Sequence, residues 1–205
     1  RKWPDQQNQG MTAAPESAGK TTDLVSFVPR LTLEWLRTSP ELKSLEVDGT
    51  LAFVDISGFT AMSEQLSSLG KAGAEEVTDV MNATFAALLD VAYAEGGGLL
   101  KFGGDALLLL FDGDDHGPRA ARAAFAMRST LRTVGRPRTS AGTVTLRMHA
   151  GIHSGRFQFF LVGDSHRELL VTGPAATRTV EMEAASEAGE ILLSAEAAAL
   201  LDASC

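Results

Sequence analysis

Two aspartates stand fifty residues apart, each at one end of an apolar stretch and each close to glycine. Asp55 lies in FVDISGFT at 53–60, and Asp105 lies in LLKFGGDALLLLF at 99–111. Short apolar runs of this kind indicate buried strands, so each strand would deliver one carboxylate. Two converging carboxylates can hold a pair of divalent cations roughly 3.5–4 Å apart, an arrangement suited to chemistry at phosphate. The alternative is that Asp55 caps a helix and Asp105 fills a turn, but their pairing favours a metal site.

The turn that follows Asp55 adds a second chemical feature. Ser57, Gly58, Phe59 and Thr60 lead into a predicted helix. Backbone N–H groups at the start of a helix bind anions, so we expect these four residues to contact the β- and γ-phosphates of a nucleotide. Carboxylate oxygens are hard ligands, and no cluster of cysteine and histidine competes for a softer metal. The expected cofactors are therefore two Mg²⁺ or Mn²⁺ ions.

The elements that must position these residues follow from hydrophobic periodicity and from the turn residues between periodic segments. Predicted strands are 50–56, 99–102, 106–111, 144–152, 155–162, 168–172 and 190–193, and predicted helices are 24–37, 57–69, 74–95, 119–134, the end of 173–187, and 195–201. The central order is β-α-β-β-α-β. This order predicts an α+β protein with a ferredoxin-like core, in which helices cover one face of a mainly antiparallel sheet.

Composition limits the domain organisation and the range of functions. The chain has 205 residues and a formal net charge of −8, without a basic stripe, so we expect no nucleic-acid partner. The longest apolar run, 106–111, is too short to span a bilayer, and we expect no membrane partner. We predict disorder over 1–22, an N-terminal helix and linker over 23–48, and one catalytic-type domain over 49–201. The single cysteine, Cys205, allows no disulfide within the chain, which fits a cytoplasmic location.

The two aspartate motifs together resemble the class III adenylyl/guanylyl cyclase catalytic domain. FVDISGFTAMSE followed by LLKFGGDALLLLF is most similar to the first cyclase domain of soluble, bicarbonate-responsive adenylyl cyclases and their bacterial relatives. The later segments MHAGIHSGRF, FFLVGDSHRELLVTG and GEILLS fit the same pattern in the same order. The resemblance covers about Gly49 to Leu201.

The resemblance implies an activity and a set of site residues. It implies that the 3′-hydroxyl of ATP attacks the α-phosphate, giving cyclic AMP and pyrophosphate, at sites built across a head-to-tail pair of cyclase domains. Asp55 and Asp105 match the two metal-binding aspartates, and Ile56 matches the residue that lends a backbone carbonyl to a metal. Lys101 matches a purine-recognition lysine, or an anion contact in a regulatory pseudo-site. The alternative for Lys101 is a plain surface lysine.

Three positions depart from the family pattern. Thr177 and Glu181 stand where the family has an Asn that orients the ribose and an Arg that neutralises charge on the transferring phosphate. Leu170 stands where the family has its purine-selecting Asp. We therefore expect a second cyclase domain, from downstream in the same polypeptide or from a homodimer, to complete the site.

Two other functions remain open at this point. One is an inactive, nucleotide-binding or regulatory cyclase-like domain, which Thr177 and Glu181 favour for the isolated chain. The other is a diguanylate cyclase, which Ala106 disfavours because that family carries a Glu there. We expect His149 and His153, which lie on one face of a strand, to be surface or interface histidines rather than metal ligands.

Overall fold

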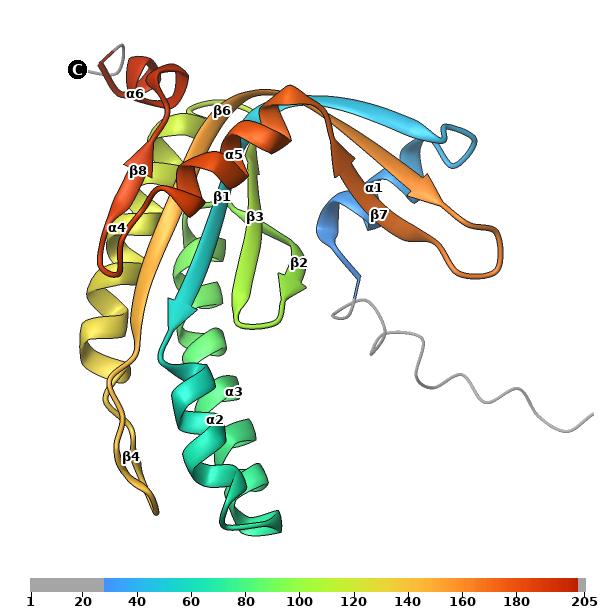
Figure 1. Cartoon of the computed structure of the whole chain (residues 1–205). Coiled ribbons are helices and arrows are strands. Elements are labelled where there is room, and N and C mark those ends of the chain that lie inside the picture. The colour runs from blue at the N-terminus through green and yellow to red at the C-terminus, as the bar shows by residue number, and fades with distance from the viewer. Residues whose placement is uncertain (1–27, 203–205) are drawn as a thin grey trace, which may run out of the picture.

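The computed structural model describes residues 28–202 (Figure 1). The helices are α1 (Arg30–Thr38), α2 (Phe59–Ser67), α3 (Lys71–Ala94), α4 (His116–Val134), α5 (Pro174–Ala184) and α6 (Ala195–Asp202). The strands are β1 (Ser44–Ser57), β2 (Gly98–Gly103), β3 (Ala106–Asp112), β4 (Arg138–Thr139), β5 (Gly142–Thr143), β6 (Arg147–Val162), β7 (Glu168–Thr172) and β8 (Ile191–Leu193).

One curled sheet organises the fold. Its strand order is β2-β3-β1-β6-β7, with all neighbours antiparallel, and β8 pairs parallel to β6 at its other side. The strands β1, β2, β3 and β6 with α3 and α4 give the β-α-β-β-α-β order of a ferredoxin-like core. The predicted α+β fold class is confirmed.

Helices α2, α3 and α4 cover one face of this sheet. Val54, Leu109 and Ile152 point into that main core, together with buried residues of all three helices. The side chains of neighbouring strand residues point the other way, because β-strand side chains alternate between faces. Leu51, Phe157 and Phe159 are therefore buried on the opposite face.

Two further helices lie on that opposite face. Trp35 of α1 is buried against Leu51 and Phe159 in a second apolar cluster. Helix α5 crosses β6 and β1 in front of the sheet, while α3 and α4 lie behind it (Figure 1). The sheet is thus covered on both faces near its centre, which explains why central strands such as β3 are apolar almost throughout.

Several boundaries differ from the sequence predictions. Strand β1 begins at Ser44, six residues earlier than predicted, and its first half pairs with the end of β6. The two strands predicted over 144–152 and 155–162 are one strand, because Gly155 stays extended opposite Gly49. Helix α1 begins at Arg30, directly after Pro29, and the first four residues of the helix predicted over 24–37 lie outside the described residues. The segment 1–22 lies outside the described residues.

The first half of β1, the second half of β6 and β7 form an outlying hairpin sheet that extends beyond α3, α4 and α5 and has α1 beside it (Figure 1). Burial along the start of β1 alternates between exposed and partly buried residues, as expected for strands covered on one side. Within residues 28–202, none of the helices combines the length and the apolar character needed to cross a membrane.

Candidate metal and nucleotide site

Strand register brings the two predicted aspartates to neighbouring strands at one end of the sheet. Asp55 on β1 lies opposite Ala106 on β3, and Asp105 directly precedes Ala106 in the β2–β3 turn. On its other side Asp55 lies opposite His149 of β6. The electrostatic effect of Asp105 on Asp55 also indicates that the two carboxyl groups are near each other.

The pKa of Asp55 is raised above its usual value. Burial is the largest cause, followed by the negative charge of Asp105, and the negative charge of Glu183 acts in the same direction. His149 and the backbone N–H of Ile56 oppose the rise. The negative charge of a partly buried carboxylate that faces two other carboxylates is poorly compensated. A bound divalent cation would stabilise its charged form. The residues present therefore fit a divalent metal ion.

The turn between Asp55 and α2 depends on a glycine. Gly58 has φ 107°, and a Cβ there would lie 2.8 Å from the carbonyl oxygen of Thr145. Only glycine adopts this left-handed conformation without a large cost. Helix α2 then begins at Phe59, so its first N–H groups lie just beyond the end of β1.

The side chains of the other predicted site residues near this turn are largely engaged elsewhere. Ile56 and Phe59 are buried in the main core, so only their backbone atoms are available to a ligand. The Ser57 hydroxyl donates to the carbonyl oxygen of Arg147 at 3.2 Å. Thr60 is exposed. A phosphate contact at this turn would therefore be made chiefly by backbone N–H groups.

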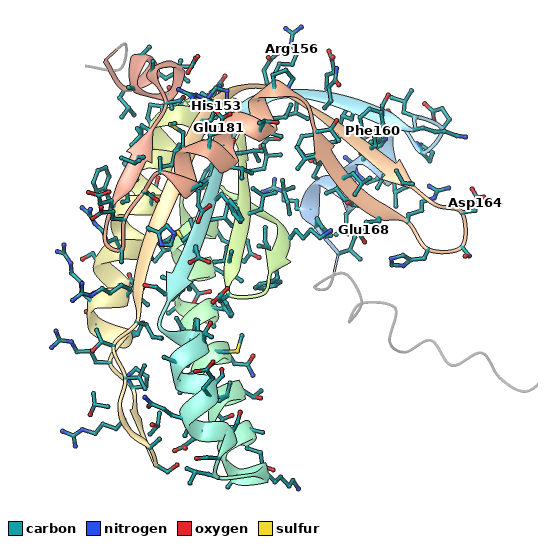
Figure 2. The ribbon with its side chains drawn as sticks, viewed as in Figure 1. His153, Arg156, Phe160, Asp164, Glu168 and Glu181 are labelled. Atoms are coloured by element: carbon teal, nitrogen blue, oxygen red, sulfur yellow. The ribbon has the colours of Figure 1, made fainter. Side chains whose placement is uncertain are left out.

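Lys101 lies on β2 and forms an ion pair with Glu168, which begins β7 in the outlying hairpin (Figure 2). Both side chains are about half exposed. The ion pair therefore links β2 and β7, the two ends of the strand order in the curled sheet. The same ion pair lowers the pKa of Glu168.

Two of the three positions that depart from the expected family pattern lie on α5. The Thr177 hydroxyl donates to the carbonyl oxygen of Gly173 at 3.3 Å, within its own helix. Glu181 accepts a hydrogen bond from Arg178 at 2.9 Å, and both side chains are exposed (Figure 2). Arg178, which lies one residue from the position of the expected asparagine, is therefore paired with a neighbour one turn away.

Sequence reasoning missed two residues beside Asp55. The structure places Nε2 of His149 3.0 Å from Oε1 of Glu183 and 3.7 Å from Oδ2 of Asp55. His149 is only 17% exposed in the single chain, less than is usual for a surface histidine, and its place at an interface between domains stays a prediction. His153 is buried as well and hydrogen-bonds Ser194 at 2.8 Å. Glu183 was not singled out because its contact depends on how α5 crosses β6.

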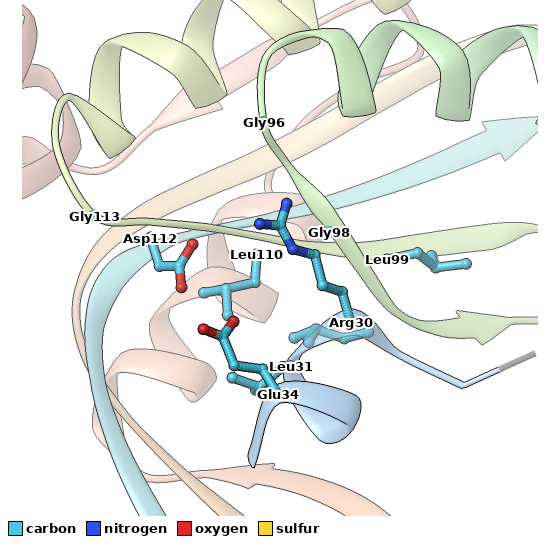
Figure 3. Close-up of a pocket in the computed structure, with 10 residues that line it drawn as sticks. Arg30, Leu31, Glu34, Gly96, Gly98, Leu99, Leu110, Asp112 and Gly113 are labelled. Atoms are coloured by element: carbon cyan, nitrogen blue, oxygen red, sulfur yellow. The ribbon is translucent and has the colours of Figure 1, made fainter. Parts of the chain in front are cut away.

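A separate pocket lies between α1 and the β2–β3 hairpin (Figure 3). It has a volume of about 230 Å³, and its polar lining includes Arg30, Glu34 and Asp112. Asp112 ends β3, whereas Asp105 precedes the start of that strand. The pocket is therefore at the opposite end of β3 from the aspartate pair and is not part of that site.

Comparison with known proteins finds a matching protein family and similar sequences. Residues 45–205 match the family model of the adenylate and guanylate cyclase catalytic domain. The chain is 31% identical over 178 residues to adenylate cyclase type 10 of Homo sapiens, an alignment covering 81% of this chain and 11% of the relative. The corresponding protein of Mus musculus is 30% identical over 172 residues. The chain thus spans about a tenth of the length of these curated relatives.

Solved structures agree with this match. The adenylyl cyclase CyaB from P. aeruginosa superposes with a TM-score of 0.65 at 27% identity, covering 79% of this chain and 84% of that chain. The guanylyl cyclase Cya2 superposes with a TM-score of 0.64 at 29% identity, covering 79% of each chain.

Proposed function

Because this chain belongs to the adenylate and guanylate cyclase catalytic domain family, we propose that it is the metal-donating domain of an adenylyl cyclase. The complete enzyme converts ATP to cyclic AMP and pyrophosphate. One observation carries the proposal: Asp55 and Asp105 come from adjacent strands to one place beside the start of α2.

In this proposal the chain supplies ligands for metal and for phosphate. The carboxylates of Asp55 and Asp105, with the backbone carbonyl of Ile56, would hold two Mg²⁺ or Mn²⁺ ions. Such ions would supply charge that favours loss of the 3′-hydroxyl proton and neutralises the triphosphate. Backbone N–H groups of residues 57–60 bind the β- and γ-phosphates and hold ATP in register with the carboxylates.

A second cyclase domain is needed because α5 offers neither an orienting amide nor a free guanidinium. Thr177 is bonded within its own helix, and Arg178 is paired with Glu181. A carboxylate at 181 would repel the phosphate rather than stabilise the transition state. The partner domain therefore supplies the Asn and the Arg, and also the groups that select the purine, since Leu170 cannot accept a hydrogen bond.

ATP is proposed as the substrate because the curated relatives at 30–31% identity are adenylate cyclases. Cya2, at 29% identity, is described as a guanylyl cyclase, so GTP has to be tested as well. Lys101 would contact the purine or an anion only after release from Glu168.

A second candidate function is a regulatory domain that binds nucleotide without turnover. Two contacts favour this function, because Thr177 is hydrogen-bonded within its own helix and Glu181 is paired with Arg178. The retained aspartate pair favours the enzyme, because a regulator without turnover does not require both carboxylates.

The test measures cyclic AMP from Mn²⁺–ATP and cyclic GMP from Mn²⁺–GTP, with this chain alone and with an added cyclase domain that carries the Asn and Arg. We expect activity only with the added domain. Asp55→Asn or Asp105→Asn should lower that activity at least about 100-fold, as loss of a charge-stabilising group typically does. Asp112→Asn, at the other end of β3, is the matched control and should retain activity.

Two results would contradict the proposal. Full activity in both aspartate variants would remove the metal assignment. Nucleotide binding without turnover in every mixture would favour the regulatory function.

A further inference from the structure

A histidine lies between two carboxylates next to the aspartate pair. Nε2 of His149 is 3.0 Å from Oε1 of Glu183 and 3.7 Å from Oδ2 of Asp55. One ligand atom from each of the three residues lies within 4.8 Å of the others. Metal–ligand bonds of about 2.0–2.2 Å in a tetrahedral site place ligand atoms roughly 3.3–3.6 Å apart, so only small side-chain shifts would bring all three onto one ion.

The fold fixes this arrangement from three separate elements. Asp55 and His149 are direct cross-strand partners on β1 and β6, so their side chains lie on the same face. Glu183 comes from α5, which packs against β6 at Gly151. The close approach of the helix backbone to that glycine sets the position of Glu183 above the strand.

We call Asp55, His149 and Glu183 the His149 cluster. Negative charge predominates in and around this cluster. Among the side chains of the described residues whose charge acts on Asp55, Asp105 and Glu183 raise its pKa, and His149 acts in the opposite direction. The three side chains are between 16% and 26% exposed, so water screens them only partly. A divalent cation would compensate this negative charge.

We propose that the His149 cluster binds a borderline divalent transition-metal ion, with Zn²⁺ as the best fit. One imidazole nitrogen and two carboxylate oxygens, with water as fourth ligand, make a coordination set that Zn²⁺ accepts. Mg²⁺ prefers oxygen ligands throughout and belongs with Asp55 and Asp105 instead. The cluster is thus a second metal position that differs from the aspartate pair in its nitrogen ligand.

The outer nitrogen of His149 limits the strength of this site. Within residues 28–202, Nδ1 is buried and has no hydrogen-bond partner. Metal-bound histidines usually donate that N–H to a carboxylate or carbonyl, and loss of such support typically weakens binding about 10–100-fold. We therefore expect reversible binding rather than a permanently held structural ion.

The two metal positions share Asp55, which gives the His149 cluster a regulatory consequence. A Zn²⁺ ion that takes Asp55 withdraws it from the pair with Asp105. Zn²⁺ should therefore compete with Mn²⁺–ATP. This consequence rests on the proposed function, whereas binding of Zn²⁺ itself does not.

The experiment measures metal binding by the chain alone, without nucleotide. Zn²⁺ is titrated calorimetrically, and Co²⁺ is used as a coloured substitute whose visible absorption reports its coordination. The test variants are His149→Asn and Glu183→Gln. The controls are Asp105→Asn, which leaves all three ligands of the His149 cluster in place, His166→Asn, an exposed histidine, and Glu181→Gln, an exposed glutamate on the same helix. Circular dichroism establishes that each variant is folded.

We expect one Zn²⁺ site that is at least about tenfold weaker in His149→Asn and in Glu183→Gln, a loss comparable to or larger than that caused by removing outer-sphere support. The three controls should bind Zn²⁺ as the unmodified chain does. No Zn²⁺ binding, or equal loss in Asp105→Asn, would overturn the proposal, as would unchanged binding in both test variants. Each of these readouts is independent of turnover, so failure of the cyclase assay would leave the result interpretable.

Discussion

Replacement of Gly151 by alanine should displace α5 from the sheet. A Cβ at Gly151 would lie 2.1 Å from the backbone N of Glu183 and 2.6 Å from the carbonyl carbon of Met182. Both atoms belong to helix backbone, so no side-chain rotation relieves the contact. An ordinary van der Waals separation is about 3.5 Å, and α5 must therefore retreat by about 1.4 Å at this point.

The stability cost follows from this geometry. Gly151 has an extended backbone that alanine adopts without strain, so the steric clash is the main effect. Overpacking against rigid neighbours typically costs 1–3 kcal/mol, and a clash with backbone should fall in the upper half, about 2–3 kcal/mol. For a chain of this length that corresponds to a fall in Tm of about 4–12 °C.

The same displacement should weaken the His149 cluster. If Glu183 moves away with α5, its 3.0 Å contact with His149 opens beyond hydrogen-bond distance. Thermal unfolding measures the first effect, and Zn²⁺ titration measures the second. Gly98→Ala is the control, because Gly98 also lies in a strand of this sheet and a Cβ there would meet nothing nearer than 3.9 Å. It should leave both Tm and Zn²⁺ binding nearly unchanged.

A Gly151→Ala protein with the Tm of the unmodified chain would refute the packing argument. A lowered Tm with unchanged Zn²⁺ binding would show instead that Glu183 does not depend on the close approach of α5 to β6.

Three other outcomes are expected. The pKa of His153 is lowered, chiefly by burial, so its protonation favours the unfolded chain. The contribution of His153 to the free energy of unfolding should be complete above about pH 6.5 and should fall as the pH drops below that value. His153→Asn should flatten this part of the Tm–pH profile. The double substitution Thr177→Asn and Glu181→Arg should give the chain cyclic AMP synthesis that rises faster than linearly with protein concentration, and a linear or absent response would contradict the assigned positions. Lys101→Ala should raise the pKa of Glu168, seen by NMR titration, without a measurable change in Tm, because that ion pair is exposed.

The fold could be predicted largely from local patterns. The apolar runs, the glycines around Asp105 and the helical spacing of α3 and α4 indicated the β-α-β-β-α-β order, because each element carries its own periodicity. The placement of Asp55 and Asp105 on adjacent strands also follows from that order. The early start of β1 at Ser44 was missed because Asp48 and Gly49 are typical turn residues, although burial alternates through them in the structure.

The rest of the site depends on packing that no local pattern encodes. Glu183 meets His149 only because α5 lies close to β6, and that approach depends on the absence of a side chain at Gly151. The pairing of Lys101 with Glu168 arises because the sheet curls and brings β2 toward β7. Crossing angles and sheet curvature are tertiary properties, so the sequence alone indicated the aspartates but not their neighbours.

The pairing of β1 with β6 has a consequence for the order in which the chain folds during synthesis. Ser44 pairs with Phe160, and Ser57 pairs with Arg147, so the partner of β1 lies far downstream. Some 105 residues separate the end of β1 from the end of β6. At 5–20 residues per second, a ribosome needs about 5–20 s to make them. During that interval β1 can pair with β3 on one side only. The other edge of β1, which later pairs with β6, stays open to chaperones or to other nascent chains.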